Sequence, residues 1–518
     1  MIDQSYLDSA HLLRRAGFGA APDVIRAAAV AGLDSTTAAL LNPPSDNLAS
    51  QDDEFISRLA ALAPENAKAR LPMQAVKIWW MHRMLMTSNP LVEKMTLFWH
   101  GHFTSRLGGD GTDMLEQNKL LRYHALGNFR TLTLAISRNS AMLKYLNGNQ
   151  NYKAHPNENY ARELMELFTC GIGNYTEDDV KAAARAFTGW NIRADEFAFN
   201  PRQHDDSTKT FLGKTGNWNG NDIVDILVAH PATATRLCTQ LFAFFAYPDP
   251  EPAVVDALTK TYYDSGYDIK AVMNQILRSR AFYSEKARNA VIKSPAQFVV
   301  GTIKMLGIEA AFDPQPGEIT NDAGSDAGTS ADTAAQNTLA FRPRLLGKGG
   351  GRMKDFKSAR NPKLARLAYL PVAMRSMGQD LLAPPSVKGW DGGEAWINST
   401  TLMNRVAFGE RLAQPRQTAG LLEPLVAKYA ADHGVSEAEA WVGYLAEALG
   451  PLDLTTSTRD TLVAYIRDDT GNSLTAAAPR VLPAGNTRRG PLQRARQEQA
   501  RYLGLLPLIL GTPDYQVC

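Results

Sequence analysis

Apolar residues recur at the three- and four-residue spacing of an α-helix along most of this chain of 518 residues. The longest such pattern fills residues 71–103, where methionines, aliphatic residues and aromatic residues return once per helical turn. The alternation that marks a half-buried strand is limited to 197–199 and 208–212, which flank a polar turn as hairpin candidates. The sequence therefore predicts a mostly α fold, a large multi-helix globular domain with a small β-hairpin excursion near residues 190–215.

The composition changes sharply after the first 311 residues. Residues 312–338 contain five acidic and no basic residues among glycines, prolines and serines, which is typical of a flexible surface loop or linker. A single core stops growing at roughly 250–300 residues, so a chain of this length is expected to contain subdomains. We expect an N-terminal helical region at 1–311 that carries the polar clusters, a flexible acidic loop at 312–341, and a C-terminal helical region at 342–518 packed on the first.

A basic stretch follows that loop, because residues 342–366 hold nine lysines or arginines and one aspartate. Its glycine run lacks the ending of a phosphate-binding loop, so it is either a solvated loop or a contact for an anion or polymer. Over the whole chain, the formal charge of +2 and the isoelectric point of about 8.3 give no argument for nucleic acid or an anionic membrane. We therefore expect no nucleic-acid partner.

The cysteines, the first residues and the apolar stretches indicate where in the cell the protein is located. Three widely spaced cysteines indicate neither a disulfide framework nor a zinc ribbon. The first residues lack the basic segment and apolar core of an export signal. The longest apolar stretches, near 241–247 and 503–510, are far shorter than the roughly 20 residues of a membrane span. These features predict no transmembrane segment and a cytoplasmic location, with export in complex with a partner left open.

The first polar cluster is the sequence Phe-Trp-His-Gly-His-Phe at residues 98–103. His100 and His102 would lie on one side of an extended segment but on different sides of a helix. Gly101 allows a turn or helix end here, and with that geometry both imidazoles can bind a divalent metal ion. The alternative is two histidines packed among aromatic rings and hydrogen-bonded to the backbone.

The second cluster lies on an amphipathic helix predicted at residues 158–168. Glu163 and Glu166 are three positions apart, so one face can carry both carboxylates. Arg162 is four positions from both Glu166 and Glu158 and can pair with either. A working carboxylate, as a metal ligand or a general acid or base, therefore competes with a salt-bridged structural helix.

The third cluster fills residues 203–210, where His204, Asp205 and Asp206 precede hydroxyl side chains and Lys209. These residue types can bind a metal ion or transfer protons. Turns also favour aspartate and serine for backbone reasons alone, so a plain turn is the alternative.

A late loop places Trp390 between prolines and glycines, at residues 384–393. The prolines fix an extended entry and the glycines permit tight turns. With Trp396 nearby, the loop either offers an aromatic platform for a sugar or anchors itself in the core.

These clusters belong to a longer series of motifs that resembles the bacterial DUF1800 family. In chain order the series comprises residues 11–19 (HLLRRAGFG), 98–103 (FWHGHF), 159–164 (NYAREL), 176–180 (TEDDV), 186–190 (AFTGW), 204–205 (HD), 209–213 (KTFLG), 230–234 (HPATA), 377–379 (MGQ), 384–390 (PPSVKGW) and 396–399 (WINS). The series spans nearly the whole chain, and the acidic loop looks like a region of variable length.

The resemblance implies a family of unknown function and supplies no catalytic residues. Its members often look secreted or envelope-associated, whereas this chain shows no recognisable export signal. Their genes commonly lie beside those of DUF1501 proteins, which resemble alkaline-phosphatase and sulfatase folds. The resemblance therefore implies a DUF1501-type protein as a partner.

The first functional hypothesis is a metal-dependent hydrolase acting on an envelope glycan or on a phosphate or sulfate ester. A divalent ion would lower the pKa of a bound water molecule and supply the nucleophile. The metal ligands would be His100, His102, His204 and Asp205, the catalytic carboxylates Glu163, Glu166 and Asp206, and the binding side chains Arg162, Lys209 and Trp390.

Two alternatives stay open. A metal-free glycoside hydrolase would use Glu163 and Asp205 as its pair of carboxylates. A non-catalytic helical scaffold or escort for the DUF1501-type partner would use the polar clusters as structural nodes. Convergence of the three clusters in one pocket would favour an enzyme, and their dispersal over separate helix junctions would favour the scaffold.

Overall fold

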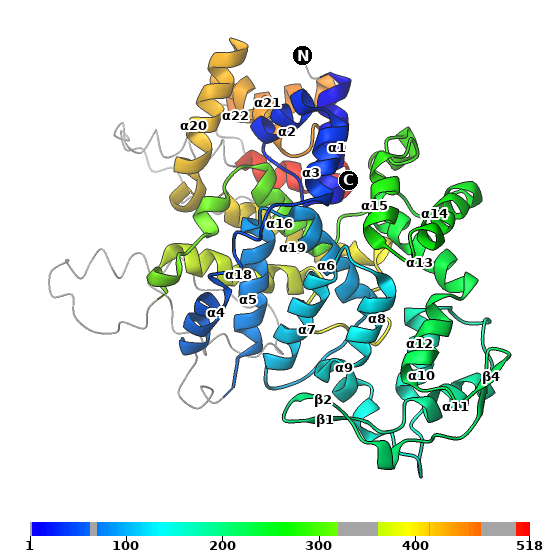
Figure 1. Cartoon of the computed structure of the whole chain (residues 1–518). Helices are drawn as coiled ribbons and strands as arrows, with labels where there is room; N and C mark the ends of the chain where they lie inside the picture. The colour runs from blue at the N-terminus through cyan, green and yellow to red at the C-terminus, as the bar shows by residue number, and fades with distance from the viewer. Residues whose placement is uncertain (1–2, 63–69, 320–360, 414, 453, 468–503) are drawn as a thin grey trace, which may run out of the picture.

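The computed structural model describes residues 3–62, 70–319, 361–413, 415–452, 454–467 and 504–518. Helices dominate these residues, and their sheets are two antiparallel pairs of short strands (Figure 1). The predicted fold class, mostly α with a small β excursion, is confirmed. Most of the acidic loop predicted at 312–341, and the basic stretch as far as residue 360, lie outside the described residues.

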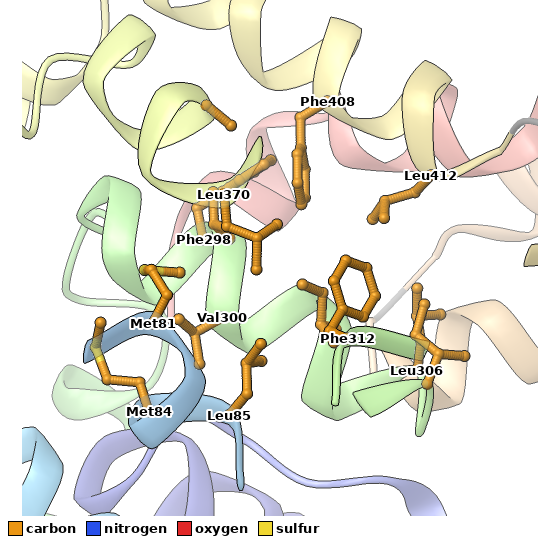
Figure 2. Packing of buried hydrophobic residues seen from close by; sticks show 14 of the residues in the cluster. Met81, Met84, Leu85, Phe298, Val300, Leu306, Phe312, Leu370, Phe408 and Leu412 are labelled. Atoms are coloured by element: carbon orange, nitrogen blue, oxygen red, sulfur yellow. The ribbon is translucent and has the colours of Figure 1, made fainter. Parts of the chain in front are cut away.

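One hydrophobic core joins helices from both predicted helical regions. The side chains of Met81, Met84 and Leu85 on α5 face Val300 of α16, with Leu370 of α18 close by (Figure 2). The N- and C-terminal parts of the chain therefore share this core. Most of its residues come from α4 (Asp52–Ala61), α5 (Met73–Met86), α16 (Pro295–Met305), α18 (Pro362–Ser376), α19 (Ser399–Leu412), α20 (Pro415–His433), α21 (Glu437–Ala448), α22 (Thr456–Arg467) and α24 (Pro513–Gln516), with the 3₁₀ turn η6 (Glu309–Phe312). Two further 3₁₀ turns are η7 (Pro316–Glu318) and η9 (Gly393–Trp396).

A second core is formed mainly by helices that lie in the sequence between α5 and α16, together with two helices from the start of the chain. It buries aromatic residues of α6 and α13 among the aliphatic residues of their neighbours. Its helices are α1 (Gln4–Ala16), α3 (Leu33–Leu41), α6 (Pro90–His102), α7 (Thr112–Tyr123), α8 (Phe129–Ser137), α9 (Ser140–Tyr145), α10 (Asn159–Glu163), α11 (Glu177–Ala186), α12 (Gly220–Val228), α13 (Pro231–Phe245), α14 (Pro252–Asp264) and α15 (Ile269–Arg278), with the short turns η3 (Leu164–Phe168) and η5 (Glu285–Ala287). Two further 3₁₀ turns are η2 (Gly148–Gln150) and η4 (Pro201–Gln203).

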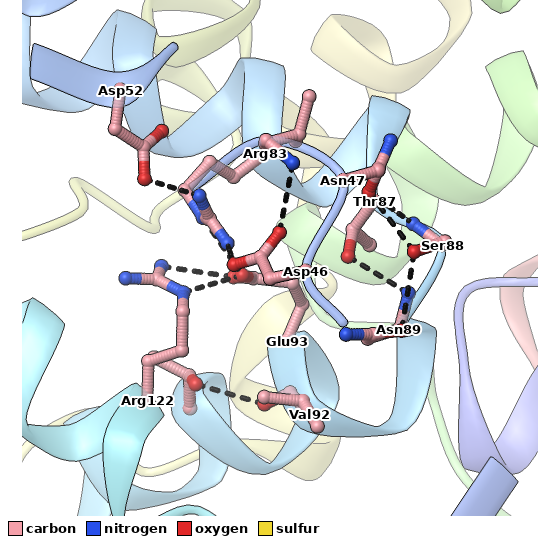
Figure 3. A network of polar contacts seen from close by, with 12 residues as sticks. Asp46, Asn47, Asp52, Arg83, Thr87, Ser88, Asn89, Val92, Glu93 and Arg122 are labelled. Carbon is pink, nitrogen blue, oxygen red and sulfur yellow. Dashed lines mark hydrogen bonds and ion pairs between the residues drawn. The ribbon is translucent and has the colours of Figure 1, made fainter. Parts of the chain in front are cut away.

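A buried ion network joins the two cores (Figure 3). Glu93 of α6 is 1% exposed and accepts hydrogen bonds from Arg83 of α5 at 3.1 Å and from Arg122 of α7 at 3.0 Å. Arg83 also pairs with Asp46 and Asp52. Burial alone would raise the pKa of Glu93, but the two arginines lower it below its usual value.

The first helices form a small cluster of their own, in which α2 (Pro22–Ala31) packs Ile25 against Tyr6 and Ala10 of α1. No single helix of the described residues is long and apolar enough to cross a membrane. The consecutive helices α2 and α3 reach the required length and composition together, with a bend of 107° between them.

Short-range signals in the sequence are visible at several helix starts. Thr176 caps α11 and exchanges hydrogen bonds with Asp179, which completes the capping box that the sequence indicates. Pro231 occupies the first turn of α13, directly after the capping residue His230. These helices begin where local chemistry satisfies their first N–H groups.

The β excursion consists of two hairpins in place of one. β1 (Trp190–Arg193) pairs with β2 (Glu196–Phe199), and β3 (Lys209–Phe211) pairs with β4 (Lys214–Gly216). The predicted strands at 197–199 and 208–212 therefore pair with nearer neighbours, not with each other. The reason is local, because Ala194–Asp195 and Leu212–Gly213 have positive φ at both positions, the conformation of tight two-residue hairpin turns.

Candidate functional site

A π-helical turn forms one wall of a surface pocket. α10 continues directly into η3, in which backbone hydrogen bonds reach one residue further than in an α-helix. The N–H group of Gly171 then donates to the carbonyl of Met165 at 2.8 Å and closes the turn. Leu164, Met165 and Phe168 of η3 are buried, whereas Glu166 and Leu167 line the pocket. π-Helical turns of this kind recur at functional sites.

The pocket opens between η3 and the first two turns of α13 and has a volume of about 740 Å³. That volume lies within the range of roughly 300–1,000 Å³ typical of ligand sites. Most of its surface is apolar, and charge comes from Glu166 on η3, Arg236 on α13 and Lys388 in the loop before η9. The lining residues are Glu166, Leu167, Cys170, Gly171, Ile172, Asn174, Ala232, Thr235, Arg236 and Lys388.

Arg236 is the cation held inside the pocket wall. Its Nη2 donates to the carbonyl of Leu167 at 3.2 Å, while its Nε is buried without a partner among the described residues. Burial lowers the pKa of the guanidinium, and neighbouring Glu166 partly offsets that effect. Gly171 has a φ of +82°, and a Cβ placed there would lie 3.4 Å from Arg236 Cδ. A glycine at this position therefore gives the arginine stem its space.

The other charges of the pocket lie nearer to solvent. Tyr175 Oη donates to Glu166 Oε2 at 3.1 Å, and burial together with this bond raises the pKa of Tyr175 to about 12. The tyrosine therefore stays protonated as a donor. The side chain of Lys388 is 71% exposed and pairs with Asp391 at 3.0 Å. The lining side chains thus carry two positive charges and one negative charge.

Glu163 does not line the pocket. It is half-buried, and burial raises the pKa of its carboxyl, as does the neighbouring charge of Glu166. Arg162 opposes that shift but is engaged elsewhere, since it binds Glu177 of α11 at 2.7 Å and Glu158 at 3.1 Å. The predicted pairing of Arg162 with Glu158 is confirmed, while Glu177 takes the place expected for Glu166.

The two histidines of the first cluster lie at different sites. His100 is 1% exposed, and its Nε2 accepts a hydrogen bond from the N–H of Leu382 at 3.2 Å. His102 forms a hydrogen bond of 3.0 Å between its Nε2 and the carbonyl of Phe168. Burial lowers the pKa of His100 to about 3 and that of His102 to about 4, so both imidazoles are neutral near pH 7.

His102 nevertheless connects the first cluster to the second, because Phe168 is the last residue of η3. The ring of His102 also contacts Phe98, Trp99 and Phe103. This geometry matches the aromatic-packed alternative. The Nε2 atom of His102 is therefore occupied by the backbone of the π-helical turn, through the hydrogen bond with the carbonyl of Phe168.

The third cluster is a tightly bonded turn. Asp205 accepts from Arg185 Nε at 2.7 Å and from the N–H of Ser207 at 3.0 Å. Although partial burial would raise it, these bonds hold the pKa of Asp205 well below its usual range. Lys209 is 1% exposed, and its Nζ donates to the carbonyls of Asp205 at 2.6 Å and Ser207 at 2.8 Å.

The remaining residues of that turn face outward or bond locally. His204 Nδ1 makes a 2.9 Å hydrogen bond with the carbonyl of Thr188, and its ring contacts Phe199. The carboxylate of Asp206 is 78% exposed and lies 3.4 Å from Lys153 Nζ. Most polar groups of this turn therefore form hydrogen bonds that stabilise the conformation of the turn itself.

Trp390 lies against the first cluster. Its ring centre is 5.5 Å from that of His100, and the tryptophan is half-buried. The loop that carries it approaches α6 closely, because a Cβ at Gly389 would lie 3.0 Å from the carbonyl of Gly101. This contact fits the second of the two interpretations of this motif, in which the loop anchors itself in the core.

The predicted metal ligands are not assembled in one place. Within the described ranges, no group of three or more His, Cys, Asp or Glu side chains is arranged to hold a metal ion. His100, His102 and His204 each direct a ring nitrogen to a backbone group, and Asp205 binds Arg185. A divalent metal stays a prediction without an assembled ligand set.

Sequence reasoning missed most of the pocket. Thr235, Arg236, Cys170 and Gly171 line the pocket but belong to none of the clusters from which a site is predicted. Lys388 belongs to the quoted Trp390 motif but carried no predicted role. Of the predicted site residues, Glu166 is the one that lines the pocket.

Comparison with known proteins gives one match. A family model described as a protein of unknown function (DUF1800) matches residues 11–517. No curated protein and no solved structure matches the chain.

Proposed function

The chain belongs to the DUF1800 family, and we propose that it is a non-catalytic helical scaffold that docks an acidic segment of a partner protein. The segment would enter the pocket beside η3 and place a carboxylate against Arg236. The observation that carries this proposal is Arg236 itself, which lines the pocket and, among the described residues, leaves its Nε without a hydrogen-bond partner.

The apolar walls of the pocket suit the rest of such a segment. Leu167, Ile172 and Ala232 line it, and Ile172 is 77% exposed, although apolar side chains of this size are usually covered. Binding would remove this surface from water at about 25 cal/mol per Å² of apolar area. Lys388 on the rim adds a second positive charge that attracts an acidic partner.

The polar clusters outside the pocket support a structural role. Arg162 ties α10 to α11 through Glu177, and Arg185 ties α11 to the turn at Asp205. Groups engaged in this way position helices, and their dispersal over separate junctions is the pattern expected for a scaffold. The DUF1501-type protein implied by the resemblance is the first partner to test.

The test measures binding of a purified DUF1501-type protein to the full chain and to two variants. Arg236→Met keeps the length and apolar stem of the side chain but removes its charge, and it should weaken binding at least about tenfold. Arg130→Met is the control, because Arg130 pairs with Asp225 on α12 and does not line the pocket. Equal affinities for both variants, or no binding of the unmodified chain, would refute the proposal.

A second candidate function is metal-free hydrolysis by two carboxylates. The specific observation is Glu163 beside Glu166, with the pKa of Glu163 raised by burial, because a carboxyl with a raised pKa can act as the general acid of such a pair. Glu166 would replace Asp205, which Arg185 holds ionised. Metal-assisted hydrolysis of an envelope glycan or of a phosphate or sulfate ester lacks an assembled ligand set in the described residues.

Chromogenic glycosides, phosphate esters and sulfate esters would test this second candidate. Turnover that disappears in both Glu163→Gln and Glu166→Gln, but persists in Glu177→Gln, would support the pair, because Glu177 is the exposed partner of Arg162. Turnover that survives either substitution in the pair would exclude it.

A further inference from the structure

The loop at residues 170–174, which follows η3, has its carbonyl groups gathered on one side. Asn174 lines the pocket and lies at the end of this loop. Its Nδ2 donates to the carbonyl of Cys170 at 2.9 Å and lies 3.4 Å and 3.5 Å from those of Gly171 and Ile172. Three successive carbonyls therefore point toward one side-chain amide.

The N–H groups of the loop consequently point to its other side. In a trans peptide, the C=O of one residue and the N–H of the next point in opposite directions. The N–H of Gly171 donates to the carbonyl of Met165 at 2.8 Å, so this other side of the loop faces η3. Among the described residues, the N–H groups of Ile172 and Gly173 have no hydrogen-bond acceptor.

The backbone around these two free N–H groups is open to a ligand. Ile172 lies between two glycines of positive φ, +82° at Gly171 and +88° at Gly173. A Cβ placed on Gly173 would meet no other atom within 4 Å. Successive N–H groups on a turn of this kind form a concave site for an anion.

The guanidinium of Arg236 lies against the same loop. A Cβ placed on Gly171 would be 3.5 Å from Arg236 Nη1, and Arg236 Nη2 donates to the carbonyl of Leu167 on η3. Burial lowers the pKa of this guanidinium, so an anion bound next to it would favour its charged form. The loop therefore combines two free N–H donors with one positive charge, which suits a carboxylate.

η3 itself offers a hydrogen-bond acceptor. Tyr175 donates to Glu166 Oε2 at 3.1 Å, whereas Oε1 of Glu166 accepts no hydrogen bond among the described residues. A ligand with both a carboxylate and an N–H group on one carbon atom could use both walls of the pocket. The last residue of a protein chain has this arrangement, whereas aspartate and glutamate side chains separate the carboxylate from the backbone N–H by additional methylene groups.

We propose that the acidic segment received by this pocket is the carboxyl-terminal end of the partner chain, with an apolar last residue. The terminal carboxylate would accept hydrogen bonds from the N–H groups of Ile172 and Gly173, and Arg236 would balance its charge. The N–H of the last residue would donate to Glu166 Oε1. This assignment rests on the docking function proposed above and specifies which part of the partner docks.

Three synthetic peptides, titrated into the full chain by calorimetry, test the assignment. Acetyl-Ala-Ala-Leu with a free carboxylate should bind, and its C-terminal amide should bind at least about tenfold more weakly, because the charge-assisted hydrogen bonds are lost. Acetyl-Ala-Glu-Leu amide carries its only carboxylate on a side chain and should bind as weakly as the first amide. Glu177→Gln is the control variant and should change none of these affinities, because Glu177 pairs with Arg162 and does not line the pocket.

A matched pair of variants tests the backbone contact. Ile172→Pro removes the N–H group at a residue whose side chain is 77% exposed, and Ile172→Ala shortens the same side chain but keeps the N–H. The free-acid peptide should bind the proline variant at least about fivefold more weakly than the alanine variant. Thermal unfolding of both variants establishes that the comparison is made between folded proteins.

The assignment and the docking function fail in different ways. Equal affinities of the acid and the amide peptide for the unmodified chain, or no binding of the acid peptide, would overturn the assignment. Arg236-dependent binding of the whole DUF1501-type protein would in that case leave docking in place, with an internal acidic segment in the pocket. Equal binding of the acid peptide by the folded proline and alanine variants would also overturn the assignment.

Discussion

Replacing Glu93 with glutamine should lower the free energy of unfolding by about 3 kcal/mol. The carboxylate accepts from Arg83 Nε at 3.1 Å, from Arg122 Nη2 at 3.0 Å and from Trp80 Nε1 at 3.2 Å, and it also pairs with Arg122 Nε. The amide of glutamine fills the same space but loses the charge and turns an NH₂ group toward donors. At least one guanidinium N–H group would then lose its acceptor in a buried site.

The magnitude follows from what remains after the substitution. Each hydrogen bond to a charged group contributes roughly 1.5–3 kcal/mol, but bonds within one network do not add. Arg83 keeps Asp46 and Asp52, and Arg122 keeps Asn118 at 2.7 Å. The expected loss therefore falls at the lower end of the 3–5 kcal/mol that breaking a buried ion pair costs (about 3 kcal/mol).

Urea unfolding followed by tryptophan fluorescence measures this loss, because Trp80 donates to Glu93 and Trp79 donates to Asp52 at 2.7 Å. The control is Glu54→Gln, whose carboxylate is 54% exposed and pairs with Arg58 across one helical turn. That change should cost no more than about 0.5 kcal/mol. A loss below about 1 kcal/mol for Glu93→Gln at an unchanged urea slope would refute the reasoning.

Two further predictions concern acid and the turn at Asp205. The folded pKa of Glu93 lies below its unfolded value of about 4.3, so the stability it contributes is present above that pH and is lost as the pH falls through the folded pKa. Unfolding against pH should therefore steepen below about pH 4 and flatten in Glu93→Gln, and an unchanged profile would contradict this assignment. Asp205→Asn should lower stability by about 1–2 kcal/mol, because Arg185 loses its charged acceptor in a partly solvated site. Binding at the pocket should be unchanged in this variant, and a loss of binding without a loss of stability would give Asp205 a functional role.

The sequence determined the features that depend on neighbouring residues. Helical spacing predicted the mostly α fold, and the motif at residues 176–180 contains the capping box with which α11 begins. The alternation of apolar and polar residues placed the β excursion in the right region but did not identify the partner strands, because each hairpin closes at a positive-φ turn that the predicted pairing did not use. Signals of this kind act over a few residues, so they can be read along the chain.

Tertiary structure alone decided which polar side chains have hydrogen-bond partners within the protein and which remain available to a ligand. His100 has its Nε2 occupied by Leu382, 282 positions away, and no spacing rule anticipates that bond. Arg236 meets the π-helical turn through Leu167 across 69 positions and becomes the main charge of the pocket. A histidine or arginine offers the same atoms in every sequence, and packing between distant helices determines whether the backbone, another side chain or a partner takes them.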